Sequence, residues 1–204
     1  MLKNKIKIWL AYLMQGLISF YLILALYHKD YLNLFSGIIC LSITFLPPII
    51  KKKWRVTLPW TLNFLIVFSL YLYVGGQIMG WYVTLSPFYD KFGHFVGSIT
   101  VALLGFALTI IVKNFSKLSL TKKQMVFFII IFTMAIGALW EIGEFITDQI
   151  LGTNAQKGLT DTMYDLIFDL LGGLFIALLI QTNFEKIKKI IVPKILEQIS
   201  KKNL

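Results

Sequence analysis

The sequence predicts an all-α integral membrane protein, a bundle of six transmembrane helices followed by a C-terminal amphipathic helix on the membrane surface. Two observations lead to this prediction. The 204-residue chain is 57% hydrophobic and 15% charged, whereas soluble domains are about 45–50% apolar and about 25% charged. Apolar runs of about 20 residues, long enough to cross a bilayer, recur along the chain. This composition excludes an ordinary soluble enzyme and a disordered chain.

Six apolar runs have the length of a membrane span. The first follows three lysines and has no cleavage site after it, so we interpret it as a retained signal anchor. We interpret residues 1–204 as one membrane domain, with scaffold spans in 1–85, polar spans in 86–182 and a cytoplasmic amphipathic tail in 183–204. The predicted spans are 8–27, 32–50, 58–80, 92–112, 125–146 and 162–181.

The basic residues predict the orientation in the membrane. With the N-terminus in the cytoplasm, 17 of the 20 basic residues fall on the inner side, and only Lys29, Lys91 and Lys157 fall outside. The positive-inside rule therefore places both termini in the cytoplasm of a bacterial inner membrane. The basic tail is expected to attract anionic lipids of the inner leaflet, and the chain has no nucleic-acid-binding motif.

Polar residues recur at helical spacing near one end of each of the last three spans. Asp90 and His94 are four residues apart, Glu141 and Glu144 three apart, and Asp161, Asp165 and Asp169 follow at intervals of four. A charge within a membrane costs about 2.5–3.5 kcal/mol on insertion scales. We expect one cluster in the outer leaflet, formed by Asp90, His94, Glu141, Glu144, Asp165 and Asp169.

A divalent cation is the first candidate counter-charge for this cluster. One imidazole among carboxylates suits Zn²⁺, Mn²⁺ or Fe²⁺, and carboxylates alone suit Mg²⁺ or Ca²⁺. The sequence favours His94, Glu141 and Asp165 as ligands and Glu144 and Asp169 as catalytic groups, with Glu144 as general base. Two acids, Asp90 and Asp161, are placed behind the ligands, Asp90 to orient His94. Loop residues that could bind a head group are Thr153, Asn154 and Gln156.

Each of these assignments has a simpler alternative. His94 could be a buried, hydrogen-bonded side chain, and the loop after the fifth span could be an ordinary exposed turn. Asp161 could be an acid favoured by the dipole at a helix N-terminus. The acids could also be protonated and form a proton or cation path.

Four short motifs resemble a known family. They are D-K-x-x-H-F from Asp90, W-E-x-x-E-F from Trp140, L-G-T from Leu151 and D-T-M-x-D-L from Asp161. They resemble the family of the bacterial inner-membrane protein YjdF over residues 86–180, and more distantly the VanZ-like group. The first resemblance implies an uncharacterised integral membrane protein, and the second a link to resistance against teicoplanin-type antibiotics. Members of the first family carry Gln-Gly-Asp after L-G-T, where this chain has residues 154–158 without an acid.

The leading functional hypothesis is metal-dependent hydrolysis or transfer on a lipid-linked or head-group substrate. A proton- or cation-coupled transporter is one alternative, and it requires a polar path to the inner side. A non-catalytic envelope or antibiotic-resistance factor is the other. Whether the protein is an enzyme stays open at this point.

Overall fold

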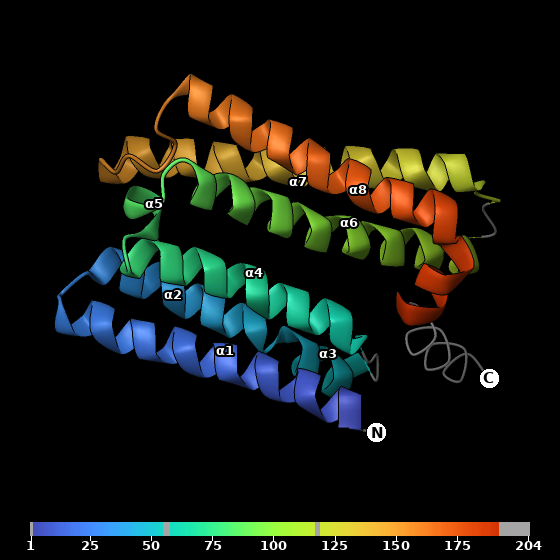
Figure 1. Cartoon of the computed structure of the whole chain (residues 1–204), viewed down its shortest axis with the longest axis horizontal. Coiled ribbons are helices and arrows are strands. Elements are labelled where there is room, and N and C mark those ends of the chain that lie inside the picture. The colour runs from blue at the N-terminus through green and yellow to red at the C-terminus, as the bar shows by residue number, and fades with distance from the viewer. Residues whose placement is uncertain (1, 55–57, 117–118, 192–204) are drawn as a thin grey trace. The chain divides into compact units, whose positions relative to one another are not determined.

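The computed structural model describes residues 2–54, 58–116 and 119–191, and within these ranges the ordered elements are all helices (Figure 1). Six helical segments are long and apolar enough to cross a membrane, which confirms the predicted all-α class with six spans. The helices are α1 (Leu2–Tyr27), α2 (Tyr31–Thr44), α3 (Leu46–Trp54), α4 (Trp60–Ile78), α5 (Trp81–Thr84), α6 (Phe88–Phe115), α7 (Lys122–Leu151) and α8 (Leu159–Ile191).

The second predicted span is divided into two helices. α2 ends at Thr44 and α3 begins at Leu46, one residue before two consecutive prolines. Proline has no backbone N–H, and its ring clashes with the carbonyl four residues earlier, so Pro47 and Pro48 cannot continue α2. The two prolines therefore interrupt the helix within one apolar run, which the sequence alone marks as a single span.

The last three spans are longer than predicted at both ends. α7, for example, begins after a capping box between Thr121 and Gln124 and is ended by the C-cap Gly152, which has a left-handed backbone conformation with φ 66°. α8 continues to Ile191, but Asn183 within it departs from helical geometry (φ −127°, ψ 37°). The end of the predicted surface helix, 192–204, lies outside the described residues.

The chain divides into two compact units, Met1–Tyr89 with Lys188–Leu204, and Asp90–Ile187. In the first unit, α1, α2 and α4 pack against one another around a core of Ile18, Tyr21, Cys40 and Val74. The amide of Gln15 donates a hydrogen bond of 3.0 Å to the Thr44 hydroxyl, which joins α1 to α2. This unit contains the first three predicted spans.

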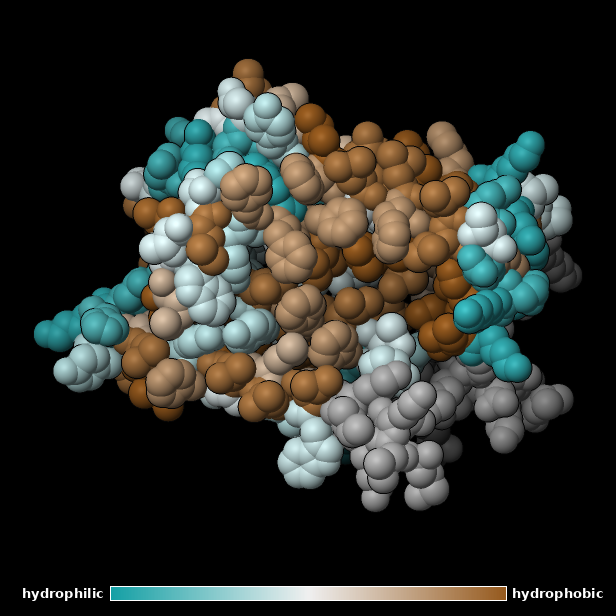
Figure 2. Space-filling view, viewed as in Figure 1, coloured by the Kyte–Doolittle hydropathy of each residue, from teal (hydrophilic) through white to brown (hydrophobic). Residues whose placement is uncertain are grey.

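The second unit contains α6, α7 and α8, which pack closely through glycines. A Cβ added to Gly172 would lie 2.8 Å from the Phe95 carbonyl oxygen, so α8 approaches the α6 backbone directly. Gly105 of α6 similarly accommodates the Phe132 ring of α7. On the face shown in the upper part of Figure 2, hydrophobic side chains gather over the middle of α6 and α8, and hydrophilic ones toward the ends. This pattern suits helices with a lipid-facing surface.

The direction of these three helices places their polar residues at one end of the second unit. α6 and α8 begin at this end and α7 finishes there, as ion pairs between the three helices show. The residues that the sequence spacing selected therefore come from the first turns of α6 and α8 and the last turns of α7.

Candidate metal centre

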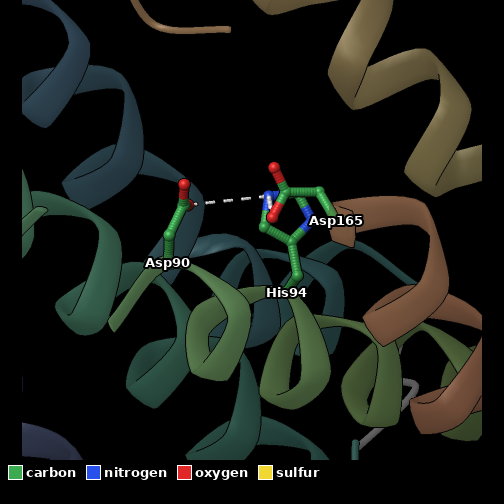
Figure 3. Close-up of side chains that lie close together, drawn as sticks. All are labelled: Asp90, His94 and Asp165. Atoms are coloured by element: carbon green, nitrogen blue, oxygen red, sulfur yellow. Dashed lines mark ion pairs between the residues drawn. The ribbon is translucent and has the colours of Figure 1, made fainter. Parts of the chain in front are cut away.

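His94 lies at the centre of a group of carboxylates in the second unit, and its side chain is only 9% exposed. Figure 3 shows the carboxylates of Asp90 and Asp165 close to the imidazole, and both pair with its Nε2 atom. Three carboxylate oxygens surround Nε2, one from each helix: Oδ1 of Asp90 at 3.9 Å, Oε1 of Glu141 at 3.7 Å and Oδ1 of Asp165 at 3.6 Å.

These separations suit a shared cation better than direct hydrogen bonds. A hydrogen bond from a ring nitrogen to oxygen spans about 2.7–3.2 Å. Two ligands that are each about 2.1 Å from one metal ion lie at most about 4.2 Å apart. One ligand atom from each of Asp90, His94 and Asp165 also lies within 4.8 Å of the others. The predicted convergence of His94, Glu141 and Asp165 is therefore present in the structure.

Glu141 supplies a second observation that points to a ligand. Its side chain is 5% exposed, and both carboxylate oxygens are buried without a hydrogen bond to the described residues. Thr162 lies beside Glu141, but its buried hydroxyl also lacks a hydrogen bond of ordinary geometry. A buried carboxylate without a donor is costly, because it has lost its hydration. A cation next to Nε2 of His94 would supply the missing partner.

Lys91 is the main positive charge that the structure brings into the cluster. Its side chain is 8% exposed, and Nζ donates hydrogen bonds of 2.5 Å to Asp161 and 2.7 Å to Asp165. The same nitrogen lies 3.6 Å from Oδ2 of Asp90. Asp161, expected behind the ligands or at the helix N-terminus, is thus tied to α6 through Lys91.

Lys157, from the loop between α7 and α8, is the second lysine of the cluster. Its Nζ donates a 2.9 Å hydrogen bond to Asp90 and lies 4.0 Å from Asp161. Two lysines and His94 therefore face the five carboxylates of Asp90, Glu141, Asp161, Asp165 and Asp169. With all five carboxylates ionised, the two lysines and even a protonated imidazole cannot balance the negative charge. A divalent cation would compensate the remaining charge.

Asp169 lies on the other side of the imidazole, one turn deeper in α8. Its Oδ1 is 3.3 Å from Nδ1 of His94 and accepts a 2.5 Å hydrogen bond from the Ser98 hydroxyl. Its Oδ2 occupies the space where a side chain on Gly137 would lie. Asp169 therefore contacts one ring nitrogen of His94, Nδ1, whereas the three other oxygens surround the second nitrogen, Nε2.

The remaining candidates lie at the edge of this group. Glu144 is half-buried and accepts a 3.1 Å hydrogen bond from the Trp140 indole. In the loop, the Thr153 hydroxyl and the Gln156 backbone N–H both donate to the Asp148 carboxylate. The Asn154 side chain is exposed. Of the three loop residues proposed to bind a head group, Thr153 and Gln156 thus stabilise the conformation of the loop through Asp148.

Sequence spacing missed several contributors to the cluster. Lys91 and Ser98 lie on the same helical face as His94, three residues before it and four after it, so the spacing was available as a signal. Gly137, four residues before Glu141, carries the same signal for α7. Lys157 belongs to a loop, where no periodicity indicates the direction of a side chain.

Comparison with known proteins identifies the family. Residues 9–186 match the family described as "Predicted membrane protein (DUF2238)", which is the family of YjdF, so the chain belongs to that family. An uncharacterized protein of Thermotoga maritima is 37% identical over 130 residues, which cover 63% of this chain and 66% of the relative. The match thus spans just under two thirds of the length of that relative. No solved structure matches the chain.

Proposed function

We propose that this membrane protein of the DUF2238 family uses Asp90, His94 and Asp165 to bind a divalent metal ion in the cell envelope. We propose further that the metal supports hydrolysis or transfer on a lipid-linked or head-group substrate. One observation carries the proposal: three carboxylate oxygens lie 3.6–3.9 Å from a buried imidazole nitrogen.

The donor set favours a transition metal or zinc over magnesium. One imidazole with carboxylates suits Zn²⁺, Mn²⁺ or Fe²⁺, whereas Mg²⁺ prefers oxygen ligands and retains several waters. In this proposal Asp90 is a ligand, and Glu141 either completes the coordination or accepts a proton. A metal with an open position lowers the pKa of bound water or polarises a phosphoryl oxygen.

Exposure indicates where a substrate would approach. Within the cluster the exposed fraction of the side chain increases from 2% at Asp165 through 18% at Asp161 to 32% at Lys157. A head group would therefore meet the loop side of the centre, near Thr153, Asn154 and Gln156. Glu144, the half-buried acid one turn from Glu141, is the proposed general base.

A non-catalytic function is the second candidate, and Lys91 favours it. Its ammonium group neutralises Asp161 and Asp165 without any added ion. In that case the cluster would stabilise the bundle or bind a lipid or an antibiotic without turnover, a role that the distant resemblance of the sequence motifs to the VanZ-like group would imply. The transporter alternative has less support, because the buried Thr109 and Thr133 each donate to a carbonyl of their own helix.

Metal analysis of matched variants tests the proposal. The chain has two histidines, so His28→Gln, at an exposed position, is the control for His94→Gln. We expect about one Zn, Mn or Fe per chain in detergent-purified wild type and in His28→Gln, as in a mononuclear site. His94→Gln should lose it while remaining monodisperse with an unchanged circular dichroism spectrum.

Two results would remove the metal from the proposal: no stoichiometric metal in wild type after supplementation, or full retention in His94→Gln. If metal is present, the loaded protein is assayed with lipid phosphates and peptidoglycan precursors. Binding of such a lipid without turnover would then favour the non-catalytic alternative.

A further inference from the structure

His94 has a different environment at each ring nitrogen. Nε2 faces the oxygens of Asp90, Glu141 and Asp165, whereas Nδ1 lies 3.3 Å from the single oxygen Oδ1 of Asp169. A neutral imidazole carries its proton on one nitrogen only, and the hydrogen bond made by one nitrogen determines whether the other is free to bind.

Ser98 determines the role of the Asp169 oxygen. Its hydroxyl lies 2.5 Å from Oδ1 and donates to it, and the residue is buried on the same face of α6 as His94. An oxygen that already accepts from Ser98 is an acceptor, so Nδ1 completes the contact by donating. A carboxylate in this position fixes both the tautomer and the ring orientation.

Gly137 makes room for this arrangement. A Cβ at position 137 would overlap Oδ2 of Asp169, so the carboxylate can reach His94 only because α7 has no side chain there. Gly143, six residues further along the same helix, differs: a Cβ there meets nothing within 4 Å. The two glycines therefore form a matched pair for testing the position of Asp169.

We propose that Asp169 is the positioning residue of His94: with Ser98 it keeps a proton on Nδ1 and so directs the lone pair of Nε2 toward Asp90, Glu141 and Asp165. This assigns Asp169 a positioning role in place of a catalytic one. The inference rests on the proposed function, because a free Nε2 is required only if it binds a cation.

The test combines nitrogen NMR with zinc binding in the full-length protein. In a His28→Gln background, ¹⁵N-labelled His94 is the only histidine, and long-range ¹H–¹⁵N correlations assign its protonated nitrogen. We expect a proton on Nδ1 with and without Zn²⁺, both in this background and with Gly143→Ala added. Gly137→Ala should abolish this preference and weaken zinc binding about 10–100-fold, the usual effect of losing a carboxylate behind a metal-binding histidine.

The outcomes separate the two proposals. If Nε2 carries a proton in the zinc-free background protein, with or without one on Nδ1, or if Gly137→Ala leaves both the spectrum and zinc affinity unchanged, the positioning role is wrong. If Nδ1 carries the proton but zinc does not bind, the positioning role stands and the metal proposal fails. If Gly137→Ala does not fold, Asp169→Ala replaces it, since it removes the acceptor of the Nδ1 proton without adding bulk, and the same spectral change is expected.

Discussion

At the residue scale, the balance of charge around Lys91 decides how the cluster is stabilised. Its ammonium group is buried and bonded to two carboxylates, Asp161 and Asp165. A buried ion pair contributes little net stability over an apolar pair, but removal of one partner leaves the other charge without compensation. Lys91 should therefore matter far more for stability than a lysine on the surface.

We predict that Lys91→Met destabilises the protein by about 3–5 kcal/mol, the usual cost of breaking a buried ion pair. The methionine keeps most of the volume but leaves Asp161 and Asp165 without their cation. Equilibrium unfolding in detergent measures the change. The control is Lys123→Met at an exposed position, where a surface substitution should change stability by less than about 0.5 kcal/mol. Equal effects of the two variants would contradict the prediction.

Residue spacing predicted part of the site for a definite reason. Asp90 and His94, like Asp165 and Asp169, are four residues apart, and a helix turns such pairs to one face whatever its neighbours are. The direction of Lys91 depends on the carboxylates of another helix, and the position of Asp169 depends on the absence of a side chain at Gly137. Single-helix periodicity places Lys91 on the face of His94 and Gly137 on the face of Glu141, but it does not say which groups of the neighbouring helices these positions meet.

At the element scale, the loop between α7 and α8 is built around one carboxylate. Asp148 accepts hydrogen bonds from the Thr153 hydroxyl and from the backbone N–H groups of Ala155 and Gln156. The left-handed Gly152 ends α7 just before this turn. The same loop carries Lys157, whose ammonium group pairs with Asp90, so the loop connects the end of α7 to the start of α6.

We predict that Asp148→Ala exposes this loop to solvent exchange. The Asp148 carboxylate accepts from the backbone N–H groups of Ala155 and Gln156, and these bonds slow exchange while they hold, so the two amide protons should exchange faster in the variant than in wild type. Hydrogen exchange followed by mass spectrometry or NMR measures the rates. Gln149→Ala, at the exposed neighbouring position, is the control and should leave exchange unchanged. Protection that survives in Asp148→Ala would show that another contact holds the loop.

The helix ends were harder to predict than the helices. Hydropathy marks where a segment stops being apolar, whereas the backbone helix continues until a cap or a breaker satisfies its terminal groups. α7 thus extends from Lys122 to Leu151, between the caps Thr121 and Gly152 and beyond the apolar run at 125–146. The same reasoning explains why the predicted span at 32–50 missed the break before Pro47, which hydropathy alone does not register.

At the scale of the whole molecule, the distribution of lysines predicts which membrane face carries the cluster. The connection between α6 and α7 contains Lys117 and the flanking Lys122 and Lys123, whereas the loop between α7 and α8 has Lys157 alone. The positive-inside rule places the first connection in the cytoplasm. We therefore predict that the loop at 152–158, and the cluster beside it, face outward, where an envelope substrate would be present.

Cysteine labelling tests this orientation. Cys40 is buried and is the only cysteine, so a Cys40→Ala background accepts one new thiol at a time. A membrane-impermeant maleimide added to intact cells should label Asn154→Cys, whose position is exposed in the loop. It should label Lys123→Cys only after permeabilisation. That position is exposed at the N-terminal end of α7, whereas the loop follows the C-terminal end of the same helix. The reverse pattern would place the cluster at the cytoplasmic face, and the substrate would then have to be sought among cytoplasmic head groups and soluble precursors.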